Sequence, residues 1–264
     1  MVPPLPMAES VRIQKGLADA GVASRRAADA LVSAGRVTIN GQLAVIGQRV
    51  DPARDALAVD GRAVVPAGKR TYLVMNKPVG ISSTVSDRYA ETTVLDLLPE
   101  AIRKSGARLY PVGRLDKDSE GLLLLTDDGD WTQHLLHPKY GVEREYAVGL
   151  DRHLSDEQAR ALTEGIELDE GTAALMHLRL ATRAENQRLE PAGSVARPLV
   201  WYRAVLTQGW RRQLRRMFAA LGLPVERLVR VRIGTFRLDD MQSGSVRRLS
   251  NAERDRLGAT RGAR

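Results

Sequence analysis

The hydrophobic residues from Thr71 onward follow two alternating spacings. Runs of apolar and β-branched residues, typical of strands, occur at residues 71–78, 121–126, 144–150, 199–206 and 231–238. Apolar residues three and four positions apart, typical of amphipathic helices, occur at residues 131–137, 155–165 and 211–222. The intervals are too irregular for repeated βαβ units. We therefore predict an α+β domain over residues 71–250, built on a mixed, largely antiparallel sheet.

The preceding residues show shorter elements. Residues 14–21 predict a short helix, and Ser24 is a suitable N-cap for a second helix that ends at Gly35. Residues 36–45 alternate around Asn40 and Gly41, a pair that favours the type I′ turn of a hairpin, and residues 57–61 predict another strand. This pattern predicts a small α/β domain over residues 10–66.

Three segments lie outside these two domains. Residues 1–9 are rich in proline, and we expect them to be disordered. The segment 64–70 combines Pro, Gly and two cations, which is typical of a linker. Residues 251–264 are expected to form a frayed basic tail.

Charge is distributed unevenly along the 264 residues. The chain has 40 Lys and Arg against 32 Asp and Glu, a formal net charge of +8. From Trp201 to the end there are fifteen Arg, no Lys and five acidic residues, so this part alone carries +10. Such an excess favours a polyanionic partner, either nucleic acid or an anionic membrane. A genome that encodes Arg in place of Lys on solvated surfaces would produce the same count.

Composition also excludes several classes of protein. With 43% hydrophobic residues the chain can bury a core, and without cysteine it has neither disulfides nor thiolate chemistry. The longest apolar run, GLLLL, is far shorter than the ~20 residues of a membrane span, and the first residues do not resemble a signal peptide. We expect a cytoplasmic protein that does not associate with membranes.

No metal or nucleotide motif is present. Two of the four histidines, His134 and His137, have a spacing of three on an expected helix, but no third ligand pattern accompanies them. The glycine-rich nucleotide motifs and GxSxG are absent. We predict no bound metal.

The segment richest in candidate chemistry is LYPVGRLDKDSEGLLLLTDDGD, in which a polar turn leads into a buried strand. Catalytic groups often lie on loops that a rigid strand fixes in place. Asp116 and Asp118 in this turn can be an acid/base pair, ligands of Ca²⁺ or Mg²⁺, or solvated loop residues. Spacing alone does not decide between them.

The N-terminal domain carries cations that can form one basic face for phosphate contacts: Arg12, Lys15, Arg25, Arg26 and Arg36. The pattern xSRRxAxxLVxxGRVxINGxxxxxGxxV, from Val11 to Gly61, resembles the alpha-L RNA-binding motif of a small-subunit ribosomal protein. The resemblance implies that this domain binds structured RNA.

The stretch GRLDKDSEGLLLLTDDG resembles the diagnostic motif of pseudouridine synthases that modify ribosomal RNA, the RsuA/RluB/RluF type. NKPVG, REYAV and QGWRRQLRRM are similar to further family motifs and occur in the family order. With the N-terminal domain, the resemblance covers about residues 11–250. It implies a catalytic domain of the pseudouridine synthase type.

The resemblance also implies roles for individual residues. Asp116 matches the essential aspartate, Tyr146 the active-site tyrosine, and Arg215 the arginine expected to pair with that aspartate. The positions implied to contact RNA are Lys77, Arg114, Arg211, Arg212 and Arg216. This sequence departs from the family at Arg211, where Asn is usual, at Ser119, where Thr is common, and at Trp210, a variable position. These departures bear on the substrate more than on the reaction.

Pseudouridine formation breaks the bond between uracil nitrogen and ribose, turns the base and rejoins it through carbon five, so no cofactor is required. A carboxylate such as Asp116 can attack the sugar or remove its neighbouring proton. A nearby arginine favours the charged carboxylate, Tyr146 can stack on a flipped uracil, and Arg211–Arg216 can hold the displaced backbone. The helix over 211–222 is expected to bury one apolar face: Leu214, Met217, Phe218 and Leu221.

The RNA target is expected to be 23S rRNA, because QGWRRQ and VEREYAV are closer to the large-subunit members of the family. The same chemistry on 16S rRNA or tRNA is an alternative, and so is a non-catalytic ribosome-assembly factor that binds RNA. We expect a monomer.

Overall fold

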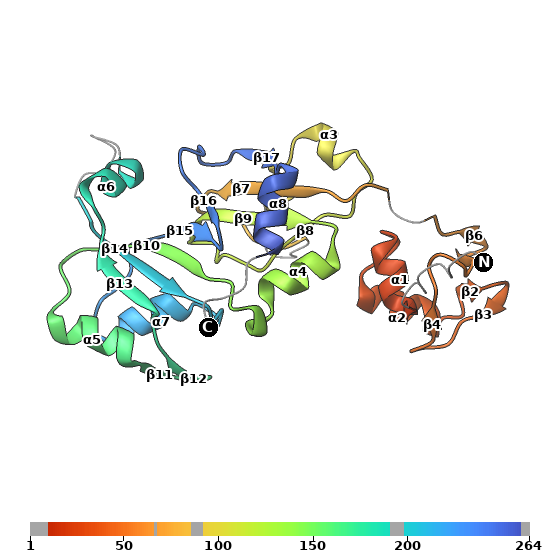
Figure 1. The fold of residues 1–264 in the computed structure, drawn as a ribbon, viewed down its shortest axis with the longest axis horizontal. Coiled ribbons are helices and arrows are strands. Elements are labelled where there is room, and N and C mark those ends of the chain that lie inside the picture. The colour runs from red at the N-terminus through yellow and green to blue at the C-terminus, as the bar shows by residue number, and fades with distance from the viewer. Residues whose placement is uncertain (1–9, 66–67, 86–91, 191–197, 260–264) are drawn as a thin grey trace, which may run out of the picture. The chain divides into compact units, whose positions relative to one another are not determined.

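The fold is that of a computed structural model in which residues 10–65, 68–85, 92–190 and 198–259 are described (Figure 1). The chain divides into two compact units. The N-terminal unit comprises Met1–Thr71 and Asp127–Gly129, and the C-terminal unit comprises Tyr72–Thr126 and Asp130–Arg264. The proline-rich residues 1–9, for which disorder is expected, lie outside the described residues.

The N-terminal unit contains the two predicted helices, α1 (Ile13–Asp19) and α2 (Arg25–Ser33). The hydroxyl of Ser24 accepts a hydrogen bond from the backbone N–H of Ala27 at 3.1 Å, which confirms the predicted N-cap. Asn40 and Gly41 both have positive φ, 51° and 82°, as the predicted hairpin turn requires. A four-stranded sheet has the order β3-β2-β5-β6, and β1 pairs with β4. These strands are β1 (Val11–Arg12), β2 (Val37–Ile39), β3 (Gln42–Leu43), β4 (Arg49–Val50), β5 (Leu57–Val59) and β6 (Arg62–Ala63).

The described part of the C-terminal unit is built on a nine-stranded sheet of order β13-β14-β10-β15-β9-β7-β17, with β16 beside β15 and β8 beside β9. Every pairing is antiparallel except that of β15 with β9. The predicted fold class, α+β on a mixed and largely antiparallel sheet, is therefore confirmed. The strands are β7 (Tyr72–Lys77), β8 (Tyr110–Pro111), β9 (Glu120–Thr126), β10 (Arg144–Leu150), β13 (His177–Leu180), β14 (Val200–Leu206), β15 (Arg227–Ile233), β16 (Phe236–Arg237) and β17 (Val246–Arg248).

Apolar clusters cover both faces of this sheet. Leu123 and Leu125 of β9 belong to one cluster, and Leu122 and Leu124 belong to the other, because successive side chains of a strand point to opposite faces. Burial on both faces explains why the strand appears in the sequence as an unbroken apolar run.

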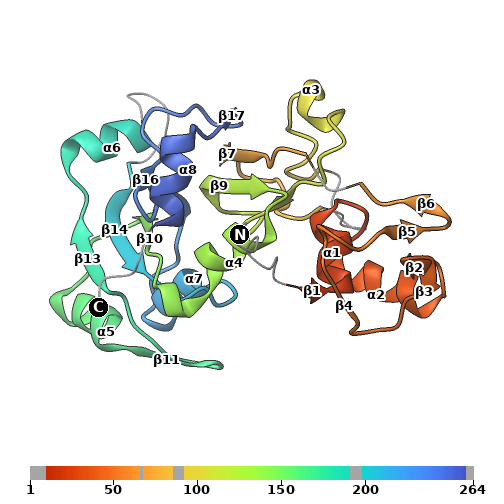
Figure 2. The same ribbon diagram turned by 45° about the vertical axis from the view of Figure 1, so that its right-hand side comes forward.

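Helices pack on both faces of the sheet (Figure 2). Helices α5 (Asp156–Glu164) and α7 (Gln213–Ala220) contribute to the cluster that contains Leu123, and α4 (Gly129–Leu136) and α8 (Asn251–Gly258) contribute to the other. Leu214, Met217 and Phe218 of α7 are buried, as predicted for this helix. The remaining elements are α3 (Glu100–Arg103), the 3-10 helix η1 (Pro138–Tyr140), α6 (Arg183–Leu189) and the hairpin strands β11 (Ile166–Leu168) and β12 (Gly171–Ala173).

The expectation of a frayed tail is wrong for residues 251–258, which form α8. Ser250 and Glu253 make a capping box, in which the serine hydroxyl accepts the N–H of Glu253 and the glutamate accepts that of Ser250. Leu257 is fully buried against the sheet, and Gly258 lies beside the ring of Trp131. Residues 260–264 lie outside the described part of the chain.

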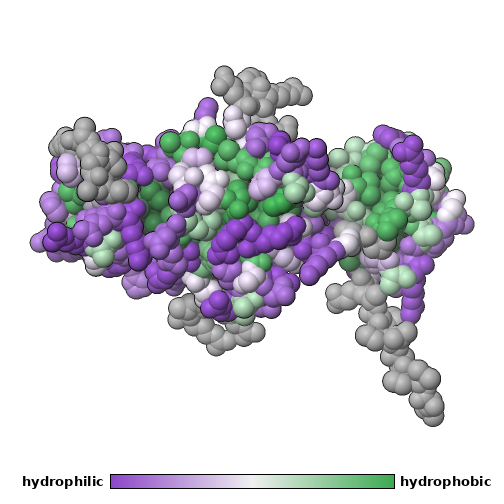
Figure 3. All heavy atoms as spheres, turned by 90° about the horizontal axis from the view of Figure 1, so that it is seen from above, coloured by the Kyte–Doolittle hydropathy of each residue, from purple (hydrophilic) through white to green (hydrophobic). Residues whose placement is uncertain are grey.

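The surface is mixed in character. On the face drawn in Figure 3, hydrophilic side chains are interspersed with smaller hydrophobic patches. In the N-terminal unit, Leu43, Val45 and Ile46 are exposed apolar residues. Within the described residues, no helix has the length and apolar character needed to cross a membrane.

Candidate active site

The turn that carries Asp116 connects β8 to β9 and is held in place by hydrogen bonds of its backbone. The N–H of Ser119 donates to the carbonyl of Asp116 at 3.0 Å, which closes the turn. A neighbouring segment holds the turn from outside: Ser83 Oγ accepts the N–H of Leu115 at 3.2 Å, and the N–H of Gly80 donates to the carbonyl of Lys117 at 2.7 Å. The Asp116 carboxylate therefore projects from a rigid loop.

Gly121, the residue after the GRLDKDSE turn, permits the only parallel strand pairing in the described sheet. It has φ +103°, and a Cβ at this position would lie 2.3 Å from the carbonyl oxygen of Arg230 in β15. No side chain fits in that space. The glycine thus brings the Asp116 turn and the Arg230 strand into direct contact.

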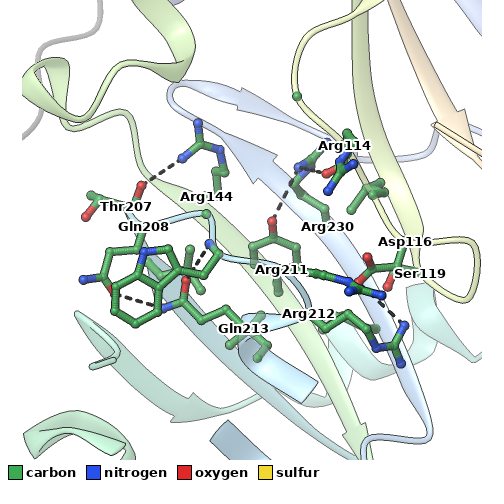
Figure 4. A pocket seen from close by; sticks show the side chains of 18 of the residues that line it. Arg114, Asp116, Ser119, Arg144, Thr207, Gln208, Arg211, Arg212, Gln213 and Arg230 are labelled. Carbon is green, nitrogen blue, oxygen red and sulfur yellow. Dashed lines mark hydrogen bonds and ion pairs between the residues drawn. The ribbon is translucent and has the colours of Figure 1, made fainter. Parts of the chain in front are cut away.

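A pocket of about 540 Å³ opens beside this contact. Asp116 and Ser119 lie at one end of it, and Thr207 and Gln208 lie at the other (Figure 4). The polar and aromatic residues that line it are Arg114, Asp116, Ser119, Arg144, Tyr146, Thr207, Gln208, Trp210, Arg211, Arg212, Gln213 and Arg230. One carboxylate and five guanidinium groups therefore face the same space.

Tyr146 reaches the pocket from β10 with the help of an irregularity in the sheet. Glu145 pairs with Arg232 but Tyr146 pairs with Arg230, so β15 has one extra residue at this point. Such a β-bulge is common beside active sites because it changes the direction of side chains. The hydroxyl of Tyr146 lies 3.4 Å from Nη1 of Arg230, and Tyr146 is 9% exposed.

The expected pair of Arg215 with Asp116 is corrected by the structure, in which Arg215 binds Asp118. Its Nη2 donates to the Asp118 carbonyl at 2.7 Å and its Nε lies 3.3 Å from the Asp118 carboxylate, while Nη1 donates to the carbonyl of Val225. Burial lowers the pKa of Arg215. Arg215 is the third residue of α7 and reaches the turn from that helix. It is not among the residues that line the pocket.

Arg212 is the guanidinium that approaches Asp116. It donates to both oxygens of Asp118 at 2.8 Å, and its Nη1 lies 3.9 Å from Oδ2 of Asp116. The hydrogen bond from Arg212 holds the pKa of Asp118 below its usual value. Arg212 has φ 49° and ψ 33°, a left-handed conformation that is uncommon for a residue other than glycine and that occurs preferentially at functional sites.

Lys77, expected to contact RNA, does not reach the pocket. It is fully buried, and its Nζ donates to the carbonyls of Pro78 and Ile81 at 2.9 and 2.8 Å. Burial lowers its pKa to about 8. Lys77 therefore fixes the segment that in turn holds the Asp116 turn, and the expectation of a direct RNA contact is wrong.

The other cations expected near the catalytic residues have different environments. Arg114 and Arg211 are exposed and line the pocket. Arg216 forms a bidentate pair with Glu170 at 2.8 Å, which ties α7 to the β11–β12 hairpin, and it does not line the pocket.

Two arginines of the pocket, Arg144 and Arg230, were not anticipated from the sequence. Arg230 is 3% exposed, and its Nε donates to the carbonyl of Leu122 at 2.7 Å. Arg144 donates to the carbonyls of Leu135 and Thr207, and burial lowers its pKa. Arg144 lies inside the recognised motif REYAV, and Arg230 lies in the apolar strand β15. The signal that could have identified them is a charged residue within an otherwise buried strand.

In the N-terminal unit, the predicted basic face is partly paired. Arg36 forms a bidentate contact with Asp60, and Lys15 lies 2.6 Å from Asp19. Arg12, Arg25 and Arg26 are exposed, and within the described ranges no ion pair involves them. These three residues are the free part of the predicted face.

The fold and the pocket define an enzyme with a single carboxylate in a cation-rich pocket large enough for a nucleoside. Among the described residues, no group of three or more His, Asp or Glu is placed to hold a metal ion. The pocket residues combine a carboxylate, aromatic rings and guanidinium groups, and guanidinium groups bind phosphates well.

Comparison with known proteins identifies the class. Residues 71–220 match the family model described as RNA pseudouridylate synthase, and residues 11–54 match the S4 domain. The chain belongs to the RNA pseudouridylate synthase family and is a pseudouridine synthase that acts on RNA. The alternative hypothesis of a non-catalytic assembly factor is therefore rejected.

Three similar proteins extend the comparison. An "uncharacterized RNA pseudouridine synthase" of Mycobacterium tuberculosis strain H37Rv is 38% identical over 92% of this chain and 91% of its own length. The ribosomal large subunit pseudouridine synthase B of Escherichia coli K12 is 36% identical over 85% of this chain and 74% of its own. A crystal structure described as a pseudouridylate synthase superposes with a TM-score of 0.61 and 26% identity, covering 94% of this chain and all of the other.

Proposed function

We propose that the protein converts one uridine of 23S ribosomal RNA to pseudouridine, with Asp116 as the catalytic carboxylate. The observation that carries the proposal is the position of Asp116. Its side chain is 33% exposed, it projects from a rigid turn into the pocket, and Tyr146, Arg212 and Arg230 surround the same space. The carboxylate of Asp118, two residues away, is paired with Arg212 and Arg215.

The proposed chemistry breaks the bond between uracil N1 and ribose C1′ and forms a bond between C5 and C1′. N1 gains a proton and C5 loses one, so atoms balance without a cofactor. Asp116 either attacks the sugar or removes the neighbouring ribose proton, and in both cases its negative charge stabilises the electron-poor sugar carbon. Arg212, 3.9 Å from the carboxylate, favours its ionised form.

Binding of the target requires that the uridine leave its stack, which costs on the order of a few kcal/mol. In the proposal, the ring of Tyr146 offsets part of this cost by stacking on the flipped uracil, a contact of roughly 1–3 kcal/mol. The guanidinium groups of Arg114, Arg211 and Arg212 bind the adjacent phosphates. Arg12, Arg25 and Arg26 of the N-terminal unit bind phosphates elsewhere on the same RNA.

The choice of 23S rRNA is supported by the names of relatives. The E. coli protein and a Pseudomonas aeruginosa protein, 36% identical over 97% of this chain and 63% of its own length, are both named ribosomal large subunit pseudouridine synthase B. Action on 16S rRNA or tRNA is the alternative.

Mapping of pseudouridines tests the proposal. Total RNA from a strain that lacks the protein and from its parent would be treated with carbodiimide and read by primer extension. We expect one stop in 23S rRNA to disappear and to return on complementation with the intact gene. If the stop that disappears lies only in 16S rRNA or tRNA, that RNA is the substrate and the proposal of 23S rRNA is wrong.

A further inference from the structure

Trp210 lies at the pocket wall with one side supported and the other side open. It lines the pocket, packs against the cluster that contains Leu123, and is neither buried nor fully exposed. The protein has three tryptophans, and the other two, Trp131 and Trp201, are 9% and 1% exposed. Trp210 is thus the tryptophan available to a ligand.

The β11–β12 hairpin supports the indole from behind. Gly171 of β12 lies beside the indole, where a Cβ would be 3.8 Å from Cη2 of Trp210. Gly171 has φ +128°, a conformation that other residues rarely adopt. The bidentate pair of Glu170 with Arg216 fastens the hairpin to α7, so the support is rigid.

The backbone of Trp210 is also fixed. Its N–H donates to Oε1 of Gln213 at 3.2 Å, and Nε2 of the same glutamine donates to Oε1 of Gln208 at 2.9 Å. Gln213 is 4% exposed and lies at the start of α7, and the two hydrogen bonds of this bridge are partly buried. Gln208 and Gln213 lie away from Asp116 in the pocket, toward the opposite end (Figure 4). The backbone that carries the indole is therefore held in place by these two hydrogen bonds.

Arg211, the next residue in the chain after Trp210, supplies a cation in the same pocket. It is exposed, it lines the pocket, and within the described residues no hydrogen bond or ion pair of its side chain is present. Proteins bind a single-stranded nucleotide with an accessible aromatic ring and an unpaired guanidinium in one pocket, with the base on the ring and the phosphate on the cation.

We propose that Trp210 and Arg211 form a second nucleotide subsite, which binds the nucleotide adjacent to the flipped uridine: Trp210 stacks on its base and Arg211 binds its phosphate. The inference rests on the proposed RNA-modifying function and adds a determinant of substrate choice. Tyr146 holds the target base, and Trp210 selects RNA in which the neighbouring base is also unstacked. Because stacking tolerates any base but requires one, the subsite reads the presence of a base more than its identity.

A cycle of protein variants and RNA variants tests the subsite. The probes are fluorescent rRNA hairpins whose loop contains the target uridine. One probe is intact, and each of the others lacks the base at one position flanking that uridine. Wild type, Trp210→Leu and Trp210→Phe would be compared, and binding would be followed by anisotropy, which does not require turnover. We expect Trp210→Leu to weaken binding of the intact hairpin about tenfold and Trp210→Phe much less.

The diagnostic result is non-additivity. At one flanking position, base removal should weaken wild-type binding about tenfold and have no further effect on Trp210→Leu. Arg211→Gln should weaken binding of every probe and lower its salt dependence, while the matched variant Arg160→Gln, an exposed arginine of α5 outside the pocket, should not. Additive losses at every flanking position would overturn the subsite.

Failure of the proposed function gives a different result. If the hairpins and full-length rRNA release no tritium from C5-labelled uridine but the non-additive binding persists, the subsite stands and the target RNA is wrong. If tritium is released and the losses are additive, the enzyme assignment stands and the subsite is wrong. If Trp210→Leu has the same melting temperature as wild type, unfolding of the β11–β12 hairpin is excluded as the cause of its weaker RNA binding.

Discussion

At the scale of single residues, the site separates two carboxylates that the sequence presents as equivalent. Asp116 and Asp118 are two positions apart in one turn, and spacing alone leaves both as candidates. In the structure, Asp118 is held by Arg212 and Arg215, and Asp116 faces the pocket. The resemblance to the family singles out Asp116 as the candidate and pairs Arg215 with it, whereas in the structure Arg215 contacts Asp118. The sequence does not reveal this pairing because it depends on the left-handed backbone of Arg212, nearly one hundred positions away.

The conformation of Arg212 gives a prediction about the balance between stability and activity. A non-glycine residue at φ 49° costs about 1 kcal/mol, which Arg212→Gly would remove, while the pair with Asp118 would be lost. We expect the melting temperature to change by only a few degrees and single-turnover tritium release to slow roughly tenfold or more, because Asp116 loses its nearest guanidinium.

The control for this variant is Arg160→Gln, which removes one exposed arginine from α5. It should leave both quantities unchanged. If Arg212→Gly turned over at the wild-type rate, the role given to Arg212 beside Asp116 would be wrong.

At the scale of elements, local patterns predicted most of the structure. The two N-terminal helices, the hairpin at Asn40 and Gly41, the buried GLLLL strand and the apolar face of α7 were all anticipated, because each rests on capping, turn or periodicity rules that act within a few residues. The strand order was not predictable, because the parallel pairing of β15 with β9 depends on a close approach at Gly121 that only the tertiary structure reveals.

Helix α8 is the element that the sequence analysis misjudged, although its signal was present. Ser250 and Glu253 have the spacing of a capping box, and Leu257 follows four residues after Glu253, one helical turn further on. This segment was expected to belong to a frayed basic tail. Its buried leucine makes it part of the fold.

Truncation of that leucine tests the role of α8. Leu257→Ala should reduce the free energy of unfolding by about 2–4 kcal/mol, because Leu257 is fully buried and the substitution leaves a cavity beside Trp131. Denaturant unfolding measures this, with the exposed Asn251→Ala at the first turn as the control. A change below about 0.5 kcal/mol for Leu257→Ala would mean that the helix does not support the sheet.

At the scale of the whole molecule, charge in the sequence and charge on the surface differ. The arginines after Trp201 account for more than the net charge, but several of them pair with acidic residues from earlier in the chain. Arg203 and Arg232 bind Glu145, and Arg227 binds Glu120. Net charge predicted a polyanionic partner correctly, since the family acts on RNA, but it overstated how much of that charge is free. Within the described residues, Arg211 and Arg230 line the pocket without an acidic partner, and composition could not have located them there.

The central claim is that Asp116 performs the chemistry, and release of tritium from C5-labelled uridine in rRNA measures it most directly. Wild type, Asp116→Ala and Asp118→Asn would be compared under single-turnover conditions, with RNA binding measured in parallel. We expect no detectable release by Asp116→Ala with binding retained, and slower but measurable release by Asp118→Asn. Release by Asp116→Ala at a rate near that of wild type would contradict it.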